Sequence, residues 1–141
     1  MVCILITVAA YAQPFVSFEG TTKGVAMTLG YQSEEGLQVA GGYNVSVTNA
    51  LSADLVYGNA GYNILLTHND EDNFTLTPTV GAAYSTVKAY KVKNSDLVTV
   101  TAIKPLFGLE LGKDWYMGRL FITANYCDRA YYGIGIKAFF K

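Results

Sequence analysis

Four charged residues that could do chemistry stand inside segments that are otherwise apolar or built from small residues. They are Glu19, Glu110, Arg119 and Lys137. If their side chains met in a closed interior, two acids and two bases could relay a proton or an ion. They could also neutralise one another and stiffen the structure, because breaking a buried ion pair costs about 3 to 5 kcal/mol. We predict the structural role and keep the relay as the alternative.

The only histidine, His68, lies in the polar stretch from Thr67 to Asn73. A serine hydrolase acting on lipid would need a Ser hydroxyl within hydrogen-bond reach of this imidazole. Neither spacing nor strand alternation places a Ser beside His68. The acidic residues 70 to 72 lack the ligand spacing and the glycine of a calcium-binding loop. We therefore predict no enzyme activity, no cofactor and no metal site.

The two cysteines indicate no disulfide. Cys3 lies in an apolar run at the N-terminus, and Cys127 lies near the end of an expected strand. If the run is removed, Cys127 remains alone, which excludes an internal disulfide. We expect an inert thiol at this position.

Length and composition limit the class of protein. The chain has 141 residues, enough for one domain. Hydrophobic residues make up 51% of it and charged residues only 15%, against roughly 25% charged in ordinary soluble domains. Ten basic and eleven acidic residues nearly cancel, and no basic stripe appears, so no nucleic-acid partner is expected.

The chain alternates between apolar and small or polar residues, which is the period of a β-strand. Turn-forming residues recur between the alternating segments. We expect strands over Pro14 to Gly20, Gly24 to Ser33, Gly36 to Ser46, Leu51 to Leu66, Phe74 to Val87, Leu97 to Gly112, Tyr116 to Cys127 and Ala130 to Phe140. Their connections are too short for parallel crossovers, so the strands should be antiparallel.

About eight antiparallel strands with short connections favour an all-β, closed up-and-down barrel, with a β-sandwich as the structural alternative. Only the stretches Thr67 to Asn73 and Lys88 to Asp96 form longer joints. The apolar residues of the strand from Leu51 to Leu66 change parity near Gly58, which predicts a β-bulge there.

The small polar face of each strand carries too little charge to be a soluble surface, which typically contains about 25 to 35% charged residues. Between Phe74 and Val87 this face consists of Thr75, Thr77, Thr79, Gly81, Ala83 and Ser85. Such residues suit the narrow interior of an eight-stranded barrel. The apolar face should therefore contact lipid, and the few strand charges, Lys104 included, should point inward.

Tyrosines supply an independent indication. Strand direction places one aromatic set near one end of the barrel and another near the opposite end, as the two interfaces of a membrane favour. The first set is Tyr84, Tyr126 and Tyr132, and the second is Tyr31, Tyr116 and Phe140.

Parity also predicts a register for the last three strands. A tight turn centred on Asp114 and Trp115 sets Glu110 opposite Arg119 in the interior. A three-residue loop from Asp128 to Ala130 would bring Lys137 diagonal to Arg119. The expected pairs are Leu109 with Leu120, Phe107 with Ile122, Ile122 with Ile136, Tyr126 with Tyr132, Val16 with Phe140 and Glu19 with Lys137.

The N-terminal run ends in Ala10, Tyr11 and Ala12, which has the small-x-small form of a signal-peptidase site. The run is too short for a membrane-spanning helix of about 20 residues. A complete signal peptide carries Lys or Arg before its apolar run, and none precedes this one. We therefore expect residues 1–12 to be only part of a signal peptide and residues 13–141 to form a single barrel domain.

The chain resembles the small outer-membrane β-barrel proteins of Gram-negative bacteria, with an OmpX-like or opacity-protein-like barrel. The resemblance lies in the leader end "AYAQ", in the strand elements "GGYNV", "AGYNILL" and "TPTVGAAY", and in the closing "YYGIGIKAFFK". It implies location in the cell outer membrane. It also implies that the barrel-assembly machinery binds the last strand through a terminal aromatic, here Phe140, although Lys141 follows it.

We therefore expect an integral outer-membrane barrel without an open pore, monomeric, with a structural or surface-interaction role. The alternatives are a small transport or binding barrel for an apolar ligand and, third, a membrane-embedded lipid-modifying enzyme. Its expected partners are membrane lipid and lipopolysaccharide. The basic joint containing Lys88, Lys91 and Lys93 is the expected contact surface for anionic lipopolysaccharide.

Overall fold

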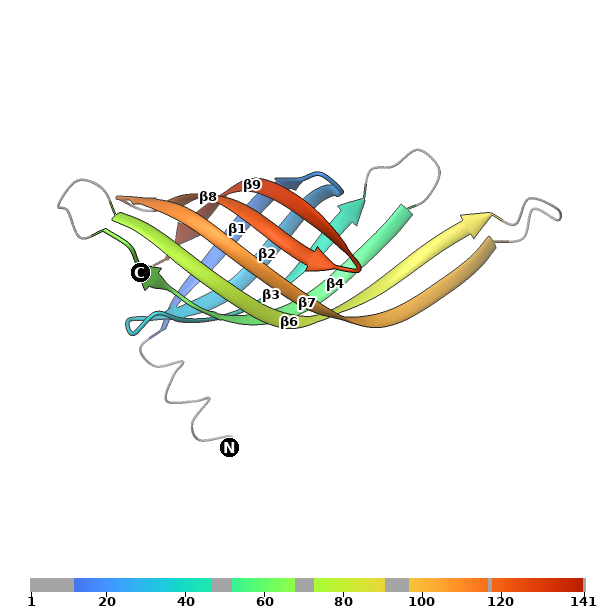
Figure 1. The fold of residues 1–141 in the computed structure, drawn as a ribbon, viewed down its shortest axis with the longest axis horizontal. Coiled ribbons are helices and arrows are strands. Elements are labelled where there is room, and N and C mark those ends of the chain that lie inside the picture. Colours follow the sequence, from blue (N-terminus) through green and yellow to red (C-terminus); the bar gives the residue numbers. More distant parts are fainter. Residues whose placement is uncertain (1–11, 47–51, 68–72, 91–96, 117, 141) are drawn as a thin grey trace, which may run out of the picture.

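The computed structural model describes residues 12–46, 52–67, 73–90, 97–116 and 118–140. The strands are β1 (Ala12–Thr21), β2 (Gly24–Ser33), β3 (Leu37–Ser46), β4 (Ser52–Tyr62), β5 (Ile64–Leu65), β6 (Asn73–Tyr90), β7 (Leu97–Trp115), β8 (Gly118–Cys127) and β9 (Arg129–Phe139). They curve into the single closed sheet of Figure 1. The described part of the chain contains no helix that is both long and apolar enough to cross a membrane.

The sheet closes because the first strand pairs with the last. β1 pairs antiparallel with β9, from Phe15 opposite Phe139 to Thr21 opposite Gly133. β4 and β5 both pair with β6 in one continuous register, so together they form a single interrupted strand. The wall is thus a closed up-and-down antiparallel barrel of eight strands, which confirms the predicted fold class.

Side chains alternate strictly between the inside and the outside of this wall. On β8, Phe121 is buried, whereas its neighbours Leu120 and Ile122 are exposed on the outer surface. The same alternation on β6 buries Thr75 and Thr77 and leaves Val80 exposed. The polar face is therefore the interior one, and the apolar face is the outer one.

Exposed aromatic side chains lie at both ends of the barrel. Tyr31, Tyr62 and Tyr116 lie at the end where the chain enters β1 and leaves β9. Tyr84, Tyr126 and Tyr132 lie toward the opposite end. We call the first the termini end and the second the far end.

The predicted register between β7 and β8 is wrong by four residues. Leu109 lies opposite Ala124 instead of Leu120, and Arg119 lies opposite Asp114 instead of Glu110. The sequence places Asp114 in the turn, but Asp114 remains in β7 because its carboxylate binds the guanidinium directly across the strand. The turn consequently falls after Trp115.

The predicted registers of β9 are wrong by two residues on both sides. Ile122 pairs with Ile134, and Tyr126 pairs with Ala130, because Asp128 adopts a φ of 65° and reverses the chain alone instead of in a three-residue loop. Asp tolerates this left-handed conformation better than most residues. Lys137 lies directly opposite Arg119. At the seam, Val16 pairs with Ala138 and Glu19 with Gly135.

The predicted bulge at Gly58 is absent, since the registers of β4 with β3 and with β6 run through Gly58 without a shift. Leu55 points inward, where it packs against an interior apolar cluster. That cluster consists of Ala83, Leu106, Cys127 and Tyr131, with Leu55 and Tyr57 against it. The sequence argument failed because it allowed apolar residues on the outer face only.

The hairpin of β6 and β7 is longer than predicted. Its strands have 18 and 19 residues, whereas the complete neighbouring strands have 10 or 11. β6 continues through Lys88 to Tyr90, a stretch predicted to be loop. In Figure 1 this hairpin extends at the right beyond the tip of the hairpin formed by β8 and β9. The barrel is therefore strongly asymmetric at its far end.

The corrected register can be tested by disulfide formation in a chain whose own cysteines are replaced by Cys3→Ser and Cys127→Ala. Leu109→Cys with Ala124→Cys should oxidise readily, because these residues lie opposite each other in the ladder. Leu109→Cys with Leu120→Cys should not, because Leu120 pairs with Lys113, about 13 Å along β7. Gel electrophoresis after mild oxidation measures both. Preferential oxidation of the second pair would contradict the observed register.

Candidate functional site

Three of the charged residues selected from the sequence meet inside the barrel. Glu110 extends from β7, Arg119 from β8 and Lys137 from β9. All three are almost inaccessible to solvent, with exposed fractions of 8%, 1% and 2%. Strand parity directs all three side chains inward, so the wall itself forces them together.

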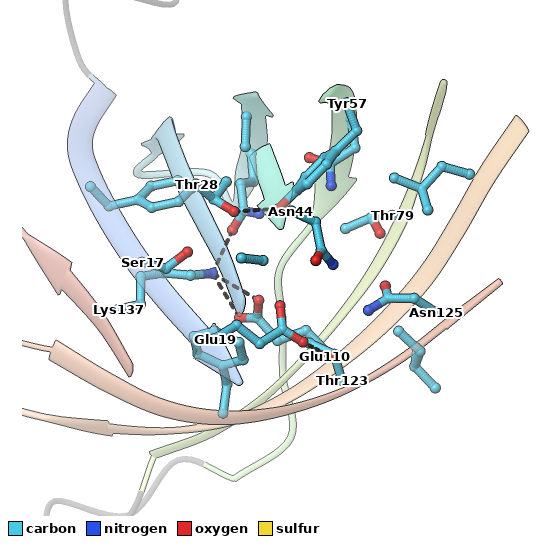
Figure 2. Close-up of a pocket in the computed structure, with 18 of the residues that line it drawn as sticks. Ser17, Glu19, Thr28, Asn44, Tyr57, Thr79, Glu110, Thr123, Asn125 and Lys137 are labelled. Atoms are coloured by element: carbon cyan, nitrogen blue, oxygen red, sulfur yellow. Dashed lines mark hydrogen bonds and ion pairs between the residues drawn. The ribbon is translucent and has the colours of Figure 1, made fainter. Parts of the chain in front are cut away.

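Glu110 and Lys137 form the central ion pair. Lys137 Nζ lies 2.7 Å from Glu110 Oε1 and 2.9 Å from Oε2, and it also donates to Gln38 Oε1 at 3.0 Å. Figure 2 shows this ammonium between side chains from opposite parts of the wall. Buried charges are stable only when they are paired and fully hydrogen-bonded. The carboxylate and the amide together satisfy Lys137 without water.

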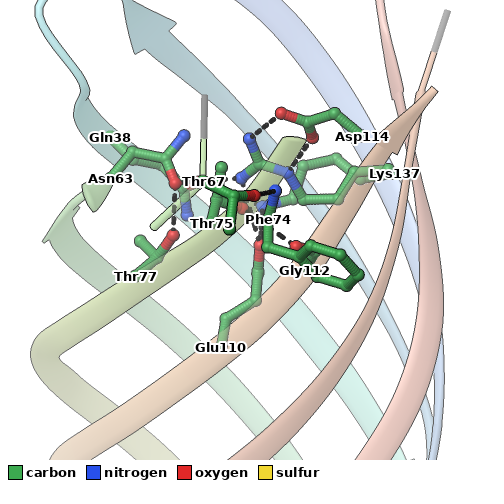
Figure 3. Close-up of polar contacts among 11 residues, drawn as sticks. Gln38, Asn63, Thr67, Phe74, Thr75, Thr77, Glu110, Gly112, Asp114 and Lys137 are labelled. Carbon is green, nitrogen blue, oxygen red and sulfur yellow. Dashed lines mark hydrogen bonds and ion pairs between the residues drawn. The ribbon is translucent and has the colours of Figure 1, made fainter. Parts of the chain in front are cut away.

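Arg119 is bound by two carboxylates and one amide. It donates through Nε and through NH2 to Asp114, the second contact measuring 3.2 Å to Oδ2. NH1 donates to Glu110 Oε1 at 3.4 Å and to Asn63 Oδ1 at 3.1 Å. Figure 3 shows that Asn63 also accepts a hydrogen bond from Thr77. Glu110 thus joins both cations, and the ionic network contains two acids and two bases.

Aromatic rings enclose the two cations. Lys137 Nζ lies 4.8 Å from the ring centroid of Phe15 and 5.4 Å from that of Phe121. The guanidinium carbon of Arg119 lies 5.5 Å from the centroid of Phe139. Desolvated cations gain from contact with ring faces. The rings therefore exclude water and contribute some stabilisation of their own.

Glycines on the inner wall provide the room for these large side chains. A Cβ at Gly112 would lie 2.4 Å from Cδ of Arg119, and a Cβ at Gly42 would lie 2.4 Å from the ring of Tyr57. No side chain could occupy either position without moving its neighbour. Each of these glycines consequently leaves space for one large interior side chain, Gly112 for Arg119 and Gly42 for Tyr57.

Asp114, Gln38, Asn63 and Thr77 also belong to the site, and none of them was selected as a site residue from the sequence. Asp114 was assigned to a turn, although it shares the parity of Glu110 on the same strand. Gln38 shares the inward parity of Ala40 and Asn44, which predicted its direction but not its contact with Lys137. Asn63 lies between the outward residues Tyr62 and Ile64, so alternation indicates its inward direction, although not its contacts with Arg119 and Thr77.

Glu19 lies inside the barrel but outside the ionic network. Its carboxylate accepts a hydrogen bond from Thr123 Oγ1. Within the described chain no salt bridge joins Glu19 to Lys137, because the seam register places Ser17 opposite Lys137. Glu19 instead lines an interior cavity.

This cavity has a volume of about 50 Å³ and lies between the ionic network and the apolar cluster. Figure 2 shows Glu19, Thr28, Asn44, Tyr57 and Thr123 around it. Tyr57 and Thr28 share a hydrogen bond of 2.5 Å between their hydroxyl oxygens. At about 10 to 15 Å³ of such volume for each water, the cavity has space for roughly three to five water molecules. Small-molecule sites are typically about 300 to 1,000 Å³, so this cavity is smaller than a typical ligand site.

Lys104 is not part of the network. It points inward from β7, but toward the far end, where its ammonium pairs with Asp128 in the β8–β9 turn. Five residues of β7 separate Lys104 from Glu110. The predicted cluster of five charges therefore divides into the ionic network, a separate Glu19 and a separate Lys104.

The other residues selected from the sequence carry no site in the described structure. Lys91, Lys93, His68 and residues 70–72 lie outside the described residues. Lys88 lies in β6, opposite Ser52. Cys127 is a buried free thiol in the apolar cluster. Across the described ranges, no group of three or more His, Cys, Asp or Glu residues is arranged to hold a metal ion.

Comparison with known proteins identifies a fold but no family. No protein-family model and no curated protein sequence matches the chain. The N-terminal β-barrel domain of Pseudomonas aeruginosa OprF is similar with a TM-score of 0.64 at 11% identity, over 92% of this chain and 96% of the other. A de novo designed transmembrane β-barrel has a TM-score of 0.56 at 18% identity, over 92% and 94%. Neisserial surface protein A (NspA) has a TM-score of 0.53 at 10% identity, over 92% and 96%.

These likenesses define the fold as that of small transmembrane β-barrels. Identities of 10 to 18% show shared architecture alone.

Glu110→Gln should lower the free energy of unfolding by about 3 to 5 kcal/mol, because it leaves Lys137 without a carboxylate and Arg119 with only Asp114. Adding Lys137→Met should recover at least about 1 kcal/mol, because the stranded charge is then gone. Urea unfolding in lipid vesicles measures both. The control Glu34→Gln, at an exposed position, should change stability by less than about 0.5 kcal/mol. Unchanged stability in Glu110→Gln would contradict the ionic network.

Proposed function

We propose that the protein is an integral barrel of the cell outer membrane with a sealed interior and a structural or surface-interaction role. The observation that carries this proposal is the outer wall. Large apolar side chains stand exposed all around it, among them Leu29 and Ile134, which are 58% and 59% exposed. Soluble monomers rarely expose apolar patches larger than a few hundred Å². Lipid is the environment in which such a wall is stable.

The interior supports a role other than transport. The ionic network spans the barrel from β3 to β9, and the cavity beneath it has room for only a few water molecules. A conducting barrel needs a continuous aqueous path, which this packing does not leave. The buried groups also satisfy one another, so the network supports stiffening of the wall over a relay.

The termini support an orientation. Both ends of the described chain lie at the same end of the barrel, and Phe140 N–H donates to the carbonyl of Pro14 at 2.9 Å across the seam. We place this end in the periplasm, where the barrel-assembly machinery would bind the last strand through the exposed Phe140. The far end and its long hairpin then face outward. There the hairpin lysines, Lys88, Lys91 and Lys93, would contact lipopolysaccharide.

We expect the full chain to fold only in detergent or lipid and to fractionate with the outer membrane when it is expressed in a Gram-negative bacterium. The folded barrel should migrate differently on a gel before and after boiling. Membrane fractionation and gel migration together test the proposal. A monodisperse, folded protein in plain buffer would contradict it.

Planar-bilayer recordings should show no steady conductance, because the ionic network closes the interior. Mass measurement of the protein after incubation with small apolar molecules should show none retained. Steady conductance would favour transport over the proposed role, and a retained molecule would favour ligand binding.

A further inference from the structure

The charged side chains inside the described barrel do not balance. The ionic network contains two acids and two bases, and Lys104 pairs with Asp128 toward the far end. Glu19 is a third acid that lines the interior, and none of the salt bridges among the described residues includes it. With its carboxyl group ionised, the ionic network and Glu19 together contain three acids against two bases.

Glu19 has a single hydrogen-bond partner within the described chain. Thr123 Oγ1 donates to Oε1, and no described residue donates to Oε2. A carboxylate offers about four sites for hydrogen bonds, so most of this capacity remains unused. A charge that is removed from bulk water is unstable unless it is paired and hydrogen-bonded. The charge of Glu19 therefore needs a partner that the described residues do not supply.

The neighbouring bases are already occupied. Lys137 lines the same cavity, but its ammonium donates to both oxygens of Glu110 and to Gln38 Oε1. An ammonium has three donor hydrogens, and these contacts use all of them. Lys23, in the turn between β1 and β2, stacks instead on an aromatic ring of β9, with Nζ 4.6 Å from the ring centroid. Neither base is therefore available to Glu19.

The cavity beside Glu19 provides the oxygen atoms that hard cations bind, which are those of carboxylates, amides and water. Besides the carboxylate, its wall contains hydroxyl and amide side chains, among them Thr28, Thr79, Thr123, Asn44, Asn59 and Asn125. Figure 2 shows most of these side chains around Glu19. In the described part of the chain, Asn59 Oδ1 is buried without a hydrogen-bond partner. A volume of about 50 Å³ has room for one small cation and a few water molecules.

We propose that this cavity binds one alkali cation, Na⁺ or K⁺, at the carboxylate of Glu19. Neutral oxygens of the cavity wall and trapped water complete its coordination, and its single positive charge balances the third acid. The cation is bound as the wall closes during folding, because the ionic network and the apolar cluster border the cavity on its two sides. The inference needs only the closed barrel, and it goes beyond the proposed structural or surface-interaction role.

A divalent cation fits this cavity less well. Ca²⁺ takes about six to eight oxygen ligands that usually include several carboxylates, and Mg²⁺ requires nearly ideal octahedral geometry. The other carboxylate on the cavity wall, that of Glu110, is engaged by Lys137 and Arg119. A double positive charge would also exceed the one negative charge that lacks a partner. The proposed site thus differs from a metal site built from several acids, which the described ranges do not contain.

The test uses the full chain folded in phosphatidylcholine vesicles, and heat-modifiable migration shows folding before each measurement. Urea unfolding gives the unfolding equilibrium constant in sodium, potassium or choline chloride at one ionic strength. Choline is the control, because its bulky quaternary group cannot be coordinated closely by oxygen. We expect the constant to fall when Na⁺ or K⁺ replaces choline, by up to about tenfold for each tenfold rise in cation concentration. A general salt effect would be equal in all three salts.

Glu19→Gln should abolish the difference between the salts, because the amide carries no charge for the cation to neutralise. In choline chloride this variant should be at least as stable as the wild type, since no unpaired carboxylate remains. The matched control Glu34→Gln, at an exposed position between β2 and β3, should retain the full response. A purely structural Glu19 would behave differently, because its replacement would lower stability equally in all salts.

Diffraction tests the proposal independently of whether Glu19→Gln folds. Crystals of the wild-type barrel grown in the stabilising salt should contain a peak beside Glu19 with the oxygen contacts of that cation. If K⁺ is the stabilising cation, thallium(I) in its place should mark the site by anomalous scattering.

Three results would overturn the proposal. Equal unfolding constants in the three salts would show that a proton or water alone accompanies Glu19. An unchanged salt response in Glu19→Gln would place the cation elsewhere on the protein. Crystals grown in the stabilising salt with only water beside Glu19 would do the same.

Discussion

The ion pairs of Glu110 are the interaction on which the interior depends. Glu110 contacts both Lys137 and Arg119, and the three side chains come from three successive strands. Eight strands enclose too little space for hydrated charges. The buried charges therefore need protein partners, which explains why Gln38, Asn63 and Thr77 converge there.

The outer and inner faces of the barrel wall are stable for different reasons. The outer face can be apolar because lipid covers it, and the interior can be polar because the charges neutralise one another. Glycines at positions such as Gly112 and Gly42 make this packing fit, since any side chain there would collide with Arg119 or Tyr57. Buried apolar side chains inside form a small cluster around Leu106 and Tyr131, and Phe15 and Phe121 are buried beside Lys137.

Alternation in the sequence was enough to predict the fold and the inward direction of Glu110, Arg119 and Lys137, but it could not predict which residues meet. The register errors were two or four residues, and an even shift keeps every side chain on its face. That is why Glu110, Arg119 and Lys137 all point inward although their predicted pairing was wrong. The turns decide the register, and they depend on Asp114 binding Arg119 and on the φ of Asp128, neither of which has a local signal. The bulge near Gly58 was predicted wrongly for a different reason. Leu55 points inward without a change of register, because an apolar residue can lie on either face when the interior contains an apolar cluster.

The account makes one central claim, that the apolar face contacts lipid and the polar face is interior. Spin labels placed singly along β8, with Cys3 and Cys127 replaced, test it residue by residue in lipid vesicles. Collisions with oxygen, which concentrates in the lipid, should peak at alternate positions: Leu120, Ile122, Ala124 and Tyr126. They should fall to minima at Phe121, Thr123 and Asn125. The opposite phase, or no alternation with a period of two, would contradict the account.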